Sequence, residues 1–354
     1  MMNNLEKLKI PVGADGAIIT SDINRRYFTG MKSSAGTILK FKDAVYLIID
    51  FRYIEKARKT VKNCEVIEQG NLTEQINSLM KKHNAKSLAV ESMDMTVHRL
   101  HFFREKFPDA EFIDSDELSN NIYDMRTVKN ADEIEKIQKA QEIAEKAFDE
   151  ILGFIRPGIT EREIALKLDG CMLENGAESL SFETIALAGK NTSMPHGVPG
   201  NYRVQSGDFV LMDFGAVYDG YHSDMTRTVC VGQPTEKMRN VYNIVLDAQL
   251  KALDAVHAGM TGSELDAMAR DHIEQNGYGD NFGHSLGHGV GMEIHEFPNA
   301  SPKSKTVLKE NMVVTVEPGI YIPDEFGVRI EDFVVVTEKS HRNLTKCPKK
   351  LIIL

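Results

Sequence analysis

The sequence has no tryptophan, few cysteines and no long apolar run. Its 4 cysteines, among 354 residues, are scattered without a Cys-x-x-Cys pair, which argues against a structural zinc site and a disulfide framework; they are Cys64, Cys171, Cys230 and Cys347. No apolar segment approaches the roughly 20 residues that cross a bilayer, and the starting segment MMNNLEKLKIPVG lacks an apolar core of signal-peptide length. We therefore expect a cytoplasmic protein that does not associate with membranes.

The charge balance argues against nucleic acid as a partner. The chain has 52 acidic and 42 basic residues, a net charge of -10, and no stripe of lysine and arginine. With 42% hydrophobic and 27% charged residues, the composition is that of an ordinary globular protein. A chain of 354 residues exceeds the usual size of a single core, so two domains are expected.

The pattern along the chain changes near residue 128. Before it, apolar runs such as GAIIT, AVYLIID and SLAVES alternate with helical patterns, which predicts an α/β domain over residues 1–127. Asn130 and Glu133 then form a helix-capping signal, followed by apolar residues at helical spacing up to Pro157. We expect a second domain over residues 128–354.

The second domain repeats itself. Residues 157–176 match residues 258–277 at a constant offset, and each copy contains a Thr-x-x-Glu capping box before a helical pattern that ends at Asn-Gly. The segment GDFVLMDFGAVY likewise parallels ENMVVTVEPGIY, which aligns Asp213 with Glu317. Two related halves that each supply an acidic residue predict one site built by both.

Four carboxylates and one histidine carry the predicted chemistry. They lie at the edges of short apolar runs or in glycine-rich turns, where strand ends could direct them into a shared cavity: Asp213, Asp224, His288, Glu317 and Glu331. Buried together, such carboxylates are costly unless protons or cations neutralise them. Oxygen and nitrogen ligands without thiolate suit hard or borderline divalent cations. The pattern suggests a hydrolase with two metal ions.

Six motifs in this part of the chain resemble those of one family: MPHG at 194–197, GDFVLMDFGA, SDMTRT, GHSLGHGVGMEIHE, VTVEPGIYIP and GVRIED. On these strings the chain resembles the metallopeptidases with the pita-bread fold, most closely Xaa-Pro dipeptidase (prolidase) and aminopeptidase P. The resemblance implies a creatinase-like α/β amino-terminal domain. It also implies an α+β pita-bread catalytic domain with an internal pseudo-twofold repeat.

The resemblance also implies a role for each residue. Asp224 and Glu331 would bridge two divalent metal ions, with Asp213 on the first and His288 and Glu317 on the second. Manganese or cobalt is expected, with zinc or iron as alternatives. Glu317 would also shuttle a proton, and His196 and His295 would supply hydrogen bonds to the transition state. His284, Tyr321 and Arg329 match the residues that line the proline side of the site.

The substrates implied are short peptides with proline at the second position. Xaa-Pro dipeptides are favoured because the short amino-terminal domain resembles that of the smaller microbial prolidases, with aminopeptidase P activity on longer peptides as the alternative. A homodimer is expected by the same resemblance.

Three other interpretations compete with this one. Gly283, Ser285 and Gly287 spell the G-x-S-x-G pattern of serine hydrolases, although the flanking sequences do not suit the strand and helix that a nucleophile elbow requires. A binding protein on the same fold that has lost its metals, or a metal-free creatinase-like amidinohydrolase, would replace ligands that this chain retains.

Overall fold

The computed structural model describes residues 4–354, which divide into two compact units, residues 4–126 and residues 127–354. The described helices of the first unit are α1 (Asn4–Lys7), α2 (Asp22–Thr29), α3 (Phe51–Thr60), α4 (Leu72–Lys82), α5 (Val97–Lys106) and α6 (Glu117–Thr127). Its strands are β1 (Gly16–Ile19), β2 (Thr37–Phe41), β3 (Val45–Ile49), β4 (Glu65–Glu68), β5 (Ser87–Val90) and β6 (Glu111–Ile113).

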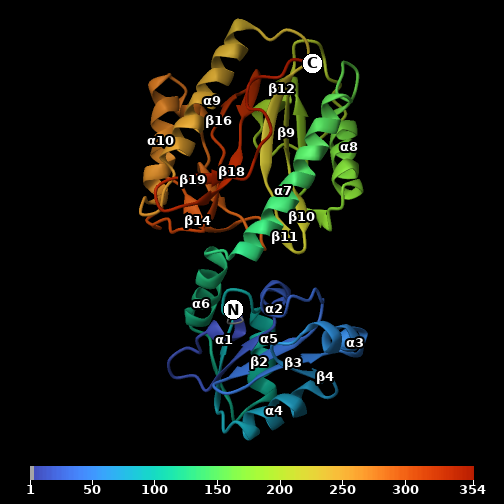
Figure 1. The fold of residues 1–354 in the computed structure, drawn as a ribbon, viewed down its shortest axis with the longest axis vertical. Coiled ribbons are helices and arrows are strands. Elements are labelled where there is room, and N and C mark those ends of the chain that lie inside the picture. The colour runs from blue at the N-terminus through green and yellow to red at the C-terminus, as the bar shows by residue number, and fades with distance from the viewer. Residues whose placement is uncertain (1–3) are drawn as a thin grey trace. The chain divides into compact units, whose positions relative to one another are not determined.

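The first unit is a six-stranded mixed sheet with helices on both faces (Figure 1). Its strand order is β4-β3-β2-β1-β5-β6, with antiparallel pairing around β2 and parallel pairing at β3-β4, β1-β5 and β5-β6. Because side chains alternate along a strand, Ala17 and Ile19 pack with α2, α3 and α6, whereas Ile18 packs with α4 and α5. The predicted α/β character of this part of the chain is confirmed.

The second unit consists of two halves with similar elements. The first half contains α7 (Ala131–Leu152), α8 (Glu161–Glu174), β7 (Ser179–Leu180), β8 (Ile185–Ala188), the 3-10 helix η1 (Gly189–Ser193), β9 (Phe209–Phe214), β10 (Ala216–Tyr218), β11 (Tyr221–His222) and β12 (Met225–Cys230). The second half contains α9 (Glu236–Ala255), α10 (Gly262–Gln275), η2 (Gly279–Asn281), β13 (Gly287–Gly289), β14 (Glu296–Ala300), β15 (Val313–Val316), β16 (Gly319–Ile322), β17 (Phe326–Arg329), β18 (Asp332–Val336) and β19 (His341–Asn343).

Helices α8 and α10 are the repeated segments seen in the sequence. Each begins with a complete capping box, Thr160 with Glu163 and Thr261 with Glu264, in which side chain and backbone satisfy each other's hydrogen bonds. The glycine after the C-cap asparagine has a positive φ in both helices, 99° and 83°, which L side chains rarely adopt. The predicted capping box of α7 at Asn130 is also present.

Two apolar cores hold the halves of the second unit. One forms between α7, α8 and the sheet β12-β9-β8, and the other between α9, α10 and the strands β15 to β18. Within this unit the strands therefore lie between the two helix pairs (Figure 1). This arrangement leaves the strand ends of both halves free to build one site.

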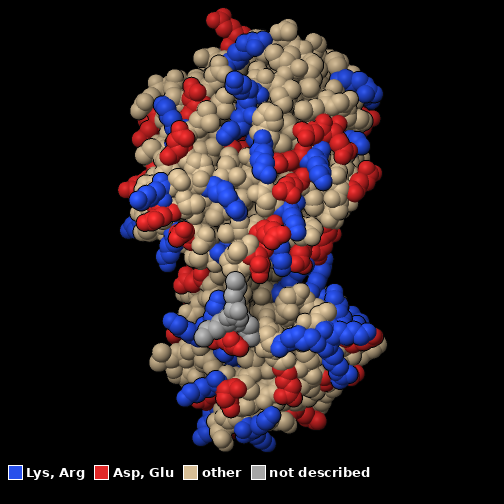
Figure 2. Space-filling view, in the orientation of Figure 1, with Lys and Arg blue, Asp and Glu red and all other residues tan. Residues whose placement is uncertain are grey.

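The surface of the second unit shows no large area of one charge on the face seen in Figure 2, where acidic and basic side chains are interspersed. Among residues 4–354, no helix combines the length and the apolar composition that crossing a membrane requires.

Candidate active site

The four carboxylates occupy equivalent places in the two halves of the second unit. Asp213 is near the end of β9, and Asp224 directly precedes β12, which pairs antiparallel with β9. Glu317 directly follows β15, and Glu331 directly precedes β18, which pairs antiparallel with β15. Each half thus delivers one acid from a strand end and a second from the start of the paired strand. The predicted convergence of distant residues arises from this repeat.

His288 completes the group from the middle of β13. Its Nε2 lies 3.5 Å from Asp224 Oδ2 and 3.5 Å from Glu317 Oε1. Its Nδ1 lies 3.1 Å from the carbonyl oxygen of Gly289, which fixes the proton on Nδ1 and leaves the Nε2 lone pair directed at the carboxylates. A neutral imidazole in this tautomer is the form that binds a metal.

The electrostatics of Asp224, Glu317, Glu331 and His288 favour the neutral forms of these four groups when no cation is bound. Burial, reinforced by the neighbouring carboxylates, raises the pKa of Asp224 and of Glu331 well above the usual range. Burial also raises the pKa of Glu317 to about 8, although the Arg329 guanidinium favours its charged form. Burial lowers the pKa of His288 to about 4. Divalent cations would stabilise the deprotonated carboxylates that this environment otherwise disfavours.

Unused ligand atoms show that the residues fit divalent metal. Among the described residues, no hydrogen-bond partner reaches the buried atoms Asp213 Oδ1 and Glu331 Oε1. Potential ligand atoms of Asp224, His288 and Glu331 all lie within 4.8 Å of one another. The second oxygen of Glu331 accepts a hydrogen bond from Thr226 Oγ1 at 2.7 Å, so one oxygen is anchored while the other stays available.

A chain of hydrogen bonds runs along one wall of the site. Arg329, 3% exposed, donates to Asp213 Oδ2 at 2.5 Å, to Tyr321 Oη at 2.8 Å and to Thr226 Oγ1 at 3.0 Å. Burial raises the pKa of Tyr321 to about 12, so its neutral hydroxyl accepts from Arg329 and donates to His284 Nε2 at 2.9 Å. His284 Nδ1 then donates to the Ser285 carbonyl at 2.8 Å.

This wall places the three residues predicted to contact substrate in one connected group. Burial, with Arg329 nearby, lowers the pKa of His284 to about 4, so the imidazole is neutral and both of its nitrogens are engaged within the protein. Arg329 borders the cavity and forms an ion pair with Asp213, so it holds this carboxylate from the wall of the site.

A cavity of about 580 Å³ joins the predicted metal ligands to the other predicted site residues. Nine of them line it: His196, Asp213, Asp224, His284, His288, His295, Glu317, Arg329 and Glu331. Tyr321 is not among the lining residues and reaches the site through its bonds to Arg329 and His284. His295 is exposed, its ring centre lies 4.3 Å from that of His288, and partial desolvation of the imidazole lowers its pKa. His196 is exposed in the turn that follows η1.

Ser285 lies in the segment between η2 and β13, with no helix following it. It borders the cavity, but the strand-turn-helix setting of a nucleophile elbow is missing at this position. The serine hydrolase interpretation therefore lacks its structural requirement.

Glu161 is a site-organising residue that the sequence reasoning missed. The first residue of α8, it is 1% exposed and accepts from Ala188 N at 2.8 Å, Asn191 Nδ2 at 2.9 Å and Gly200 N at 2.9 Å. These bonds hold the loop that carries His196. An acidic residue in the first turn of a helix is usually explained by the helix dipole, so the sequence held no signal of this second task.

The fold and the site together define a two-domain metal-dependent hydrolase of the pita-bread class. The chain matches metallopeptidase family M24 over residues 135–338 and the creatinase/prolidase N-terminal domain over residues 5–128. The protein belongs to metallopeptidase family M24. The enzymes of this family use a dinuclear divalent metal centre. The predictions of family, fold class and metal-dependent hydrolase are confirmed.

Similar proteins cover nearly the whole chain. The Xaa-Pro dipeptidase of Pyrococcus furiosus is 43% identical over 340 residues, which are 96% of this chain and 95% of that protein. A solved Xaa-Pro dipeptidase from Bacillus anthracis superimposes with a TM-score of 0.93 at 43% identity, covering 97% of this chain and 96% of that one. A solved X-Pro aminopeptidase from Thermotoga maritima superimposes with a TM-score of 0.94 at 38% identity, covering 99% of this chain and 100% of that one.

Proposed function

We propose that the protein is a dinuclear metal peptidase that hydrolyses the bond before proline and prefers Xaa-Pro dipeptides. The observation that carries the proposal is the convergence of four carboxylates and a neutral histidine on a cavity with Arg329 in its wall. The similarity to Xaa-Pro dipeptidases over nearly the whole chain supports the same activity.

The proposed ligands are the five residues predicted from the sequence: Asp213, Asp224, His288, Glu317 and Glu331. Two divalent cations bound there would lower the pKa of a water molecule toward roughly 7 and supply a nucleophile at neutral pH. Manganese or cobalt is proposed, and the oxygen-rich donor set also suits zinc or iron.

The residues of the chain would manage the protons. Glu317 borders the cavity beside the other proposed ligands, a place that suits a carboxylate that accepts a proton from attacking water and passes it on. His196 and His295 border the same cavity without taking part in the carboxylate cluster. We propose that their N–H groups stabilise the developing oxyanion and serve the leaving proline nitrogen.

Arg329 is proposed to select short substrates. Among the described residues that line the cavity, it is the only arginine or lysine. A dipeptide carries its free carboxylate one residue from the scissile bond, where a cation in the wall would offset repulsion by the acidic ligands. A tripeptide replaces this carboxylate by an amide and loses that attraction.

Substrate length tests the proposal. With the same metal, kcat/KM for Met-Pro should exceed that for Met-Pro-Ala, and Met-Ala should be a poor substrate. A clear preference for Met-Pro-Ala would instead assign aminopeptidase P activity, which the similarity to the Thermotoga maritima X-Pro aminopeptidase favours as the second candidate. Failure to cleave any of the three peptides would contradict both candidates.

Three other expectations are proposals of the same kind. We propose that residues 1–127 form the amino-terminal domain and residues 128–354 the catalytic domain, that the protein is a homodimer, and that it acts in the cytoplasm. Light scattering after gel filtration would test the dimer, because a homodimer has twice the 39.6 kDa mass of the chain.

A further inference from the structure

Strand β12 presents two different environments on its two faces. Thr226 directs its hydroxyl toward the site, where it contacts Glu331 and Arg329. Since side chains alternate along a strand, the next residue, Arg227, points to the opposite face. Arg227 is 1% exposed, and it lies behind the metal centre without reaching the cavity.

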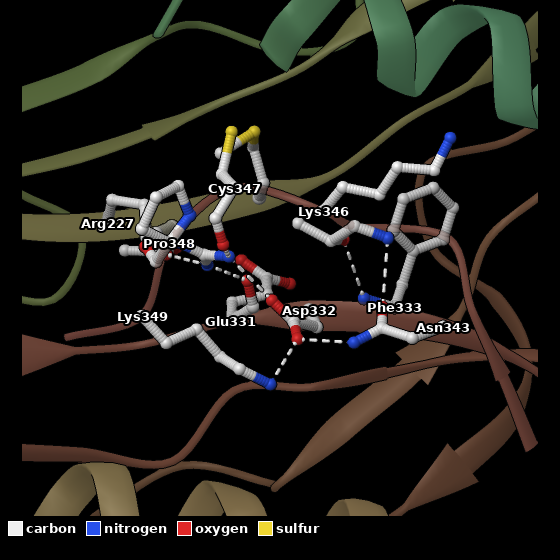
Figure 3. A network of polar contacts seen from close by, with 12 residues as sticks. Arg227, Glu331, Asp332, Phe333, Asn343, Lys346, Cys347, Pro348 and Lys349 are labelled. Carbon is white, nitrogen blue, oxygen red and sulfur yellow. Dashed lines mark hydrogen bonds and ion pairs between the residues drawn. The ribbon is translucent and has the colours of Figure 1, made fainter. Parts of the chain in front are cut away.

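The Arg227 guanidinium is saturated by five acceptors from three segments of the chain (Figure 3). Nη1 donates to the carbonyls of Thr226 at 2.9 Å and Glu331 at 2.5 Å. Nη2 donates to Asp332 Oδ1 at 2.7 Å and to the Cys347 carbonyl at 2.9 Å, and Nε donates to the Pro348 carbonyl at 3.0 Å. All five N–H groups that a guanidinium offers are therefore used.

Asp332 is held from its other side by the segment that follows β18. Its Oδ2 accepts from Asn343 Nδ2 at 2.6 Å and from Lys349 Nζ at 2.8 Å, while Arg227 holds Oδ1 (Figure 3). The carboxylate is fully buried between two cations. Its position is therefore fixed in two directions.

Glu331 is held by contacts with Thr226 and Arg227, the neighbours on β12 that face opposite sides of the strand. Glu331 donates its backbone N–H to the Thr226 carbonyl at 3.1 Å, and its own carbonyl accepts from Arg227. Its side chain is anchored by Thr226 Oγ1, which leaves Oε1 without a partner among the described residues. The backbone and one carboxylate oxygen of Glu331 are thus placed by groups on both faces of β12.

Stability alone does not explain this network. A buried ion pair often contributes no more to stability than apolar residues of the same volume, because desolvation offsets the attraction. Apolar residues in place of Arg227 and Asp332 could fill the same volume, but they could not hold the Glu331 carbonyl in a fixed position. Groups that orient metal ligands typically affect metal affinity or activity 10- to 100-fold.

We propose that Arg227 and Asp332, together with the segment Cys347–Lys349, form a positioning network that sets the place of Glu331 in the metal centre. The inference rests on the proposed role of Glu331 as a ligand. It assigns to the segment near residue 348 a task in metal binding, although this segment does not line the cavity.

Metal affinity of the Arg227→Lys variant tests the proposal. Lysine keeps the positive charge but offers three donors from a single nitrogen, so it cannot hold the five acceptors that the planar guanidinium holds. We expect Mn²⁺ to bind at least about 10-fold more weakly than to the wild type, as measured by titration calorimetry of metal-free protein at a temperature where circular dichroism shows both proteins folded. Arg25→Lys is the matched control, because Arg25 is also 1% exposed and its guanidinium bonds five acceptors, all of them within residues 20–36 of the first unit. Its Mn²⁺ affinity should stay that of the wild type.

A second variant covers the case in which Arg227→Lys does not fold. Replacing Asn343 by alanine and Lys349 by methionine removes the two partners of Asp332 Oδ2 and leaves Arg227 in place, and it should weaken Mn²⁺ binding several-fold. Folded variants that bind Mn²⁺ like the wild type, even with a lower melting temperature, would overturn the positioning role. Glu331→Gln separates the two levels of inference: if it also keeps wild-type affinity, the proposed ligand set itself is wrong.

Discussion

The metal-free protein should become more stable when Glu317 is replaced by glutamine. Glutamine keeps the size of the side chain and can still accept from Thr315 Oγ1, which lies 3.3 Å from Glu317 Oε1. Burial raises the pKa of Glu317 to about 8 from 4.5. A carboxyl group whose pKa is higher in the folded than in the unfolded state lowers stability as the pH rises between the two values. At neutral pH the free energy of unfolding of the metal-free wild type is therefore lowered by Glu317, and the variant lacks this loss of stability.

The loss of stability caused by Glu317 follows from the rise of its pKa from 4.5 to about 8. It grows by about 1.4 kcal/mol for each pH unit above 4.5 and would reach about 3 kcal/mol at pH 7. The Glu317 side chain is 16% exposed, so water in the cavity screens part of this, and we expect a gain of about 2 kcal/mol. For a domain of this size that gain corresponds to a rise in melting temperature of roughly 4–8 °C.

Calorimetric melting of chelator-treated protein at pH 5 and at pH 7.5 measures the effect. The gain should be small at pH 5 and large at pH 7.5, and Glu325→Gln, an exposed residue paired with Lys237, should show little change at either pH. With saturating Mn²⁺ the order should reverse, because the variant has lost a ligand and binds metal more weakly. A lower melting temperature of the metal-free variant at pH 7.5, or an equal gain at both pH values, would refute the electrostatic reasoning.

Three further substitutions test the proposed roles of the site residues. Asp224→Asn should leave less than about a tenth of the wild-type kcat with Mn²⁺ present, because it removes a charge assigned to both ions; a higher residual kcat would exclude the bridging role. His196→Ala should lower kcat by roughly 100-fold without changing bound metal measured by mass spectrometry, whereas Ser285→Ala should be nearly silent; metal loss in the first variant would count against a donor role. Arg329→Lys should raise KM for Met-Pro more than for Met-Pro-Ala, and equal increases would indicate that Arg329 only supports Asp213.

Local signals in the sequence predicted the elements that hold the site. The capping boxes of α7, α8 and α10 are contained within four residues each, so Asn130, Thr160 and Thr261 could be read directly. The repeat between the halves aligned Asp213 with Glu317, and the structure places both at the ends of corresponding strands. Elements whose structure is decided by one short segment could therefore be predicted from the sequence.

Features that depend on several distant segments were beyond sequence reasoning. The bond from Tyr321 to His284 and the bond from Arg329 to Asp213 join residues 37 and 116 positions apart, so the wall of the site could not be assembled from spacing. Arg227 stands inside the motif SDMTRT, yet its acceptors lie up to 121 positions away. The sequence analysis assigned no role to Arg227, and only the fold shows that it is held behind the carboxylates.

Release of proline from Met-Pro tests the central claim most directly. Protein freed of metal by a chelator should release no proline, and addition of Mn²⁺ or Co²⁺ should restore release, with proline quantified by chromatography. Full activity of the metal-free protein, or no release of proline with manganese, cobalt, zinc or iron, would contradict the assignment of a metal-dependent peptidase acting before proline.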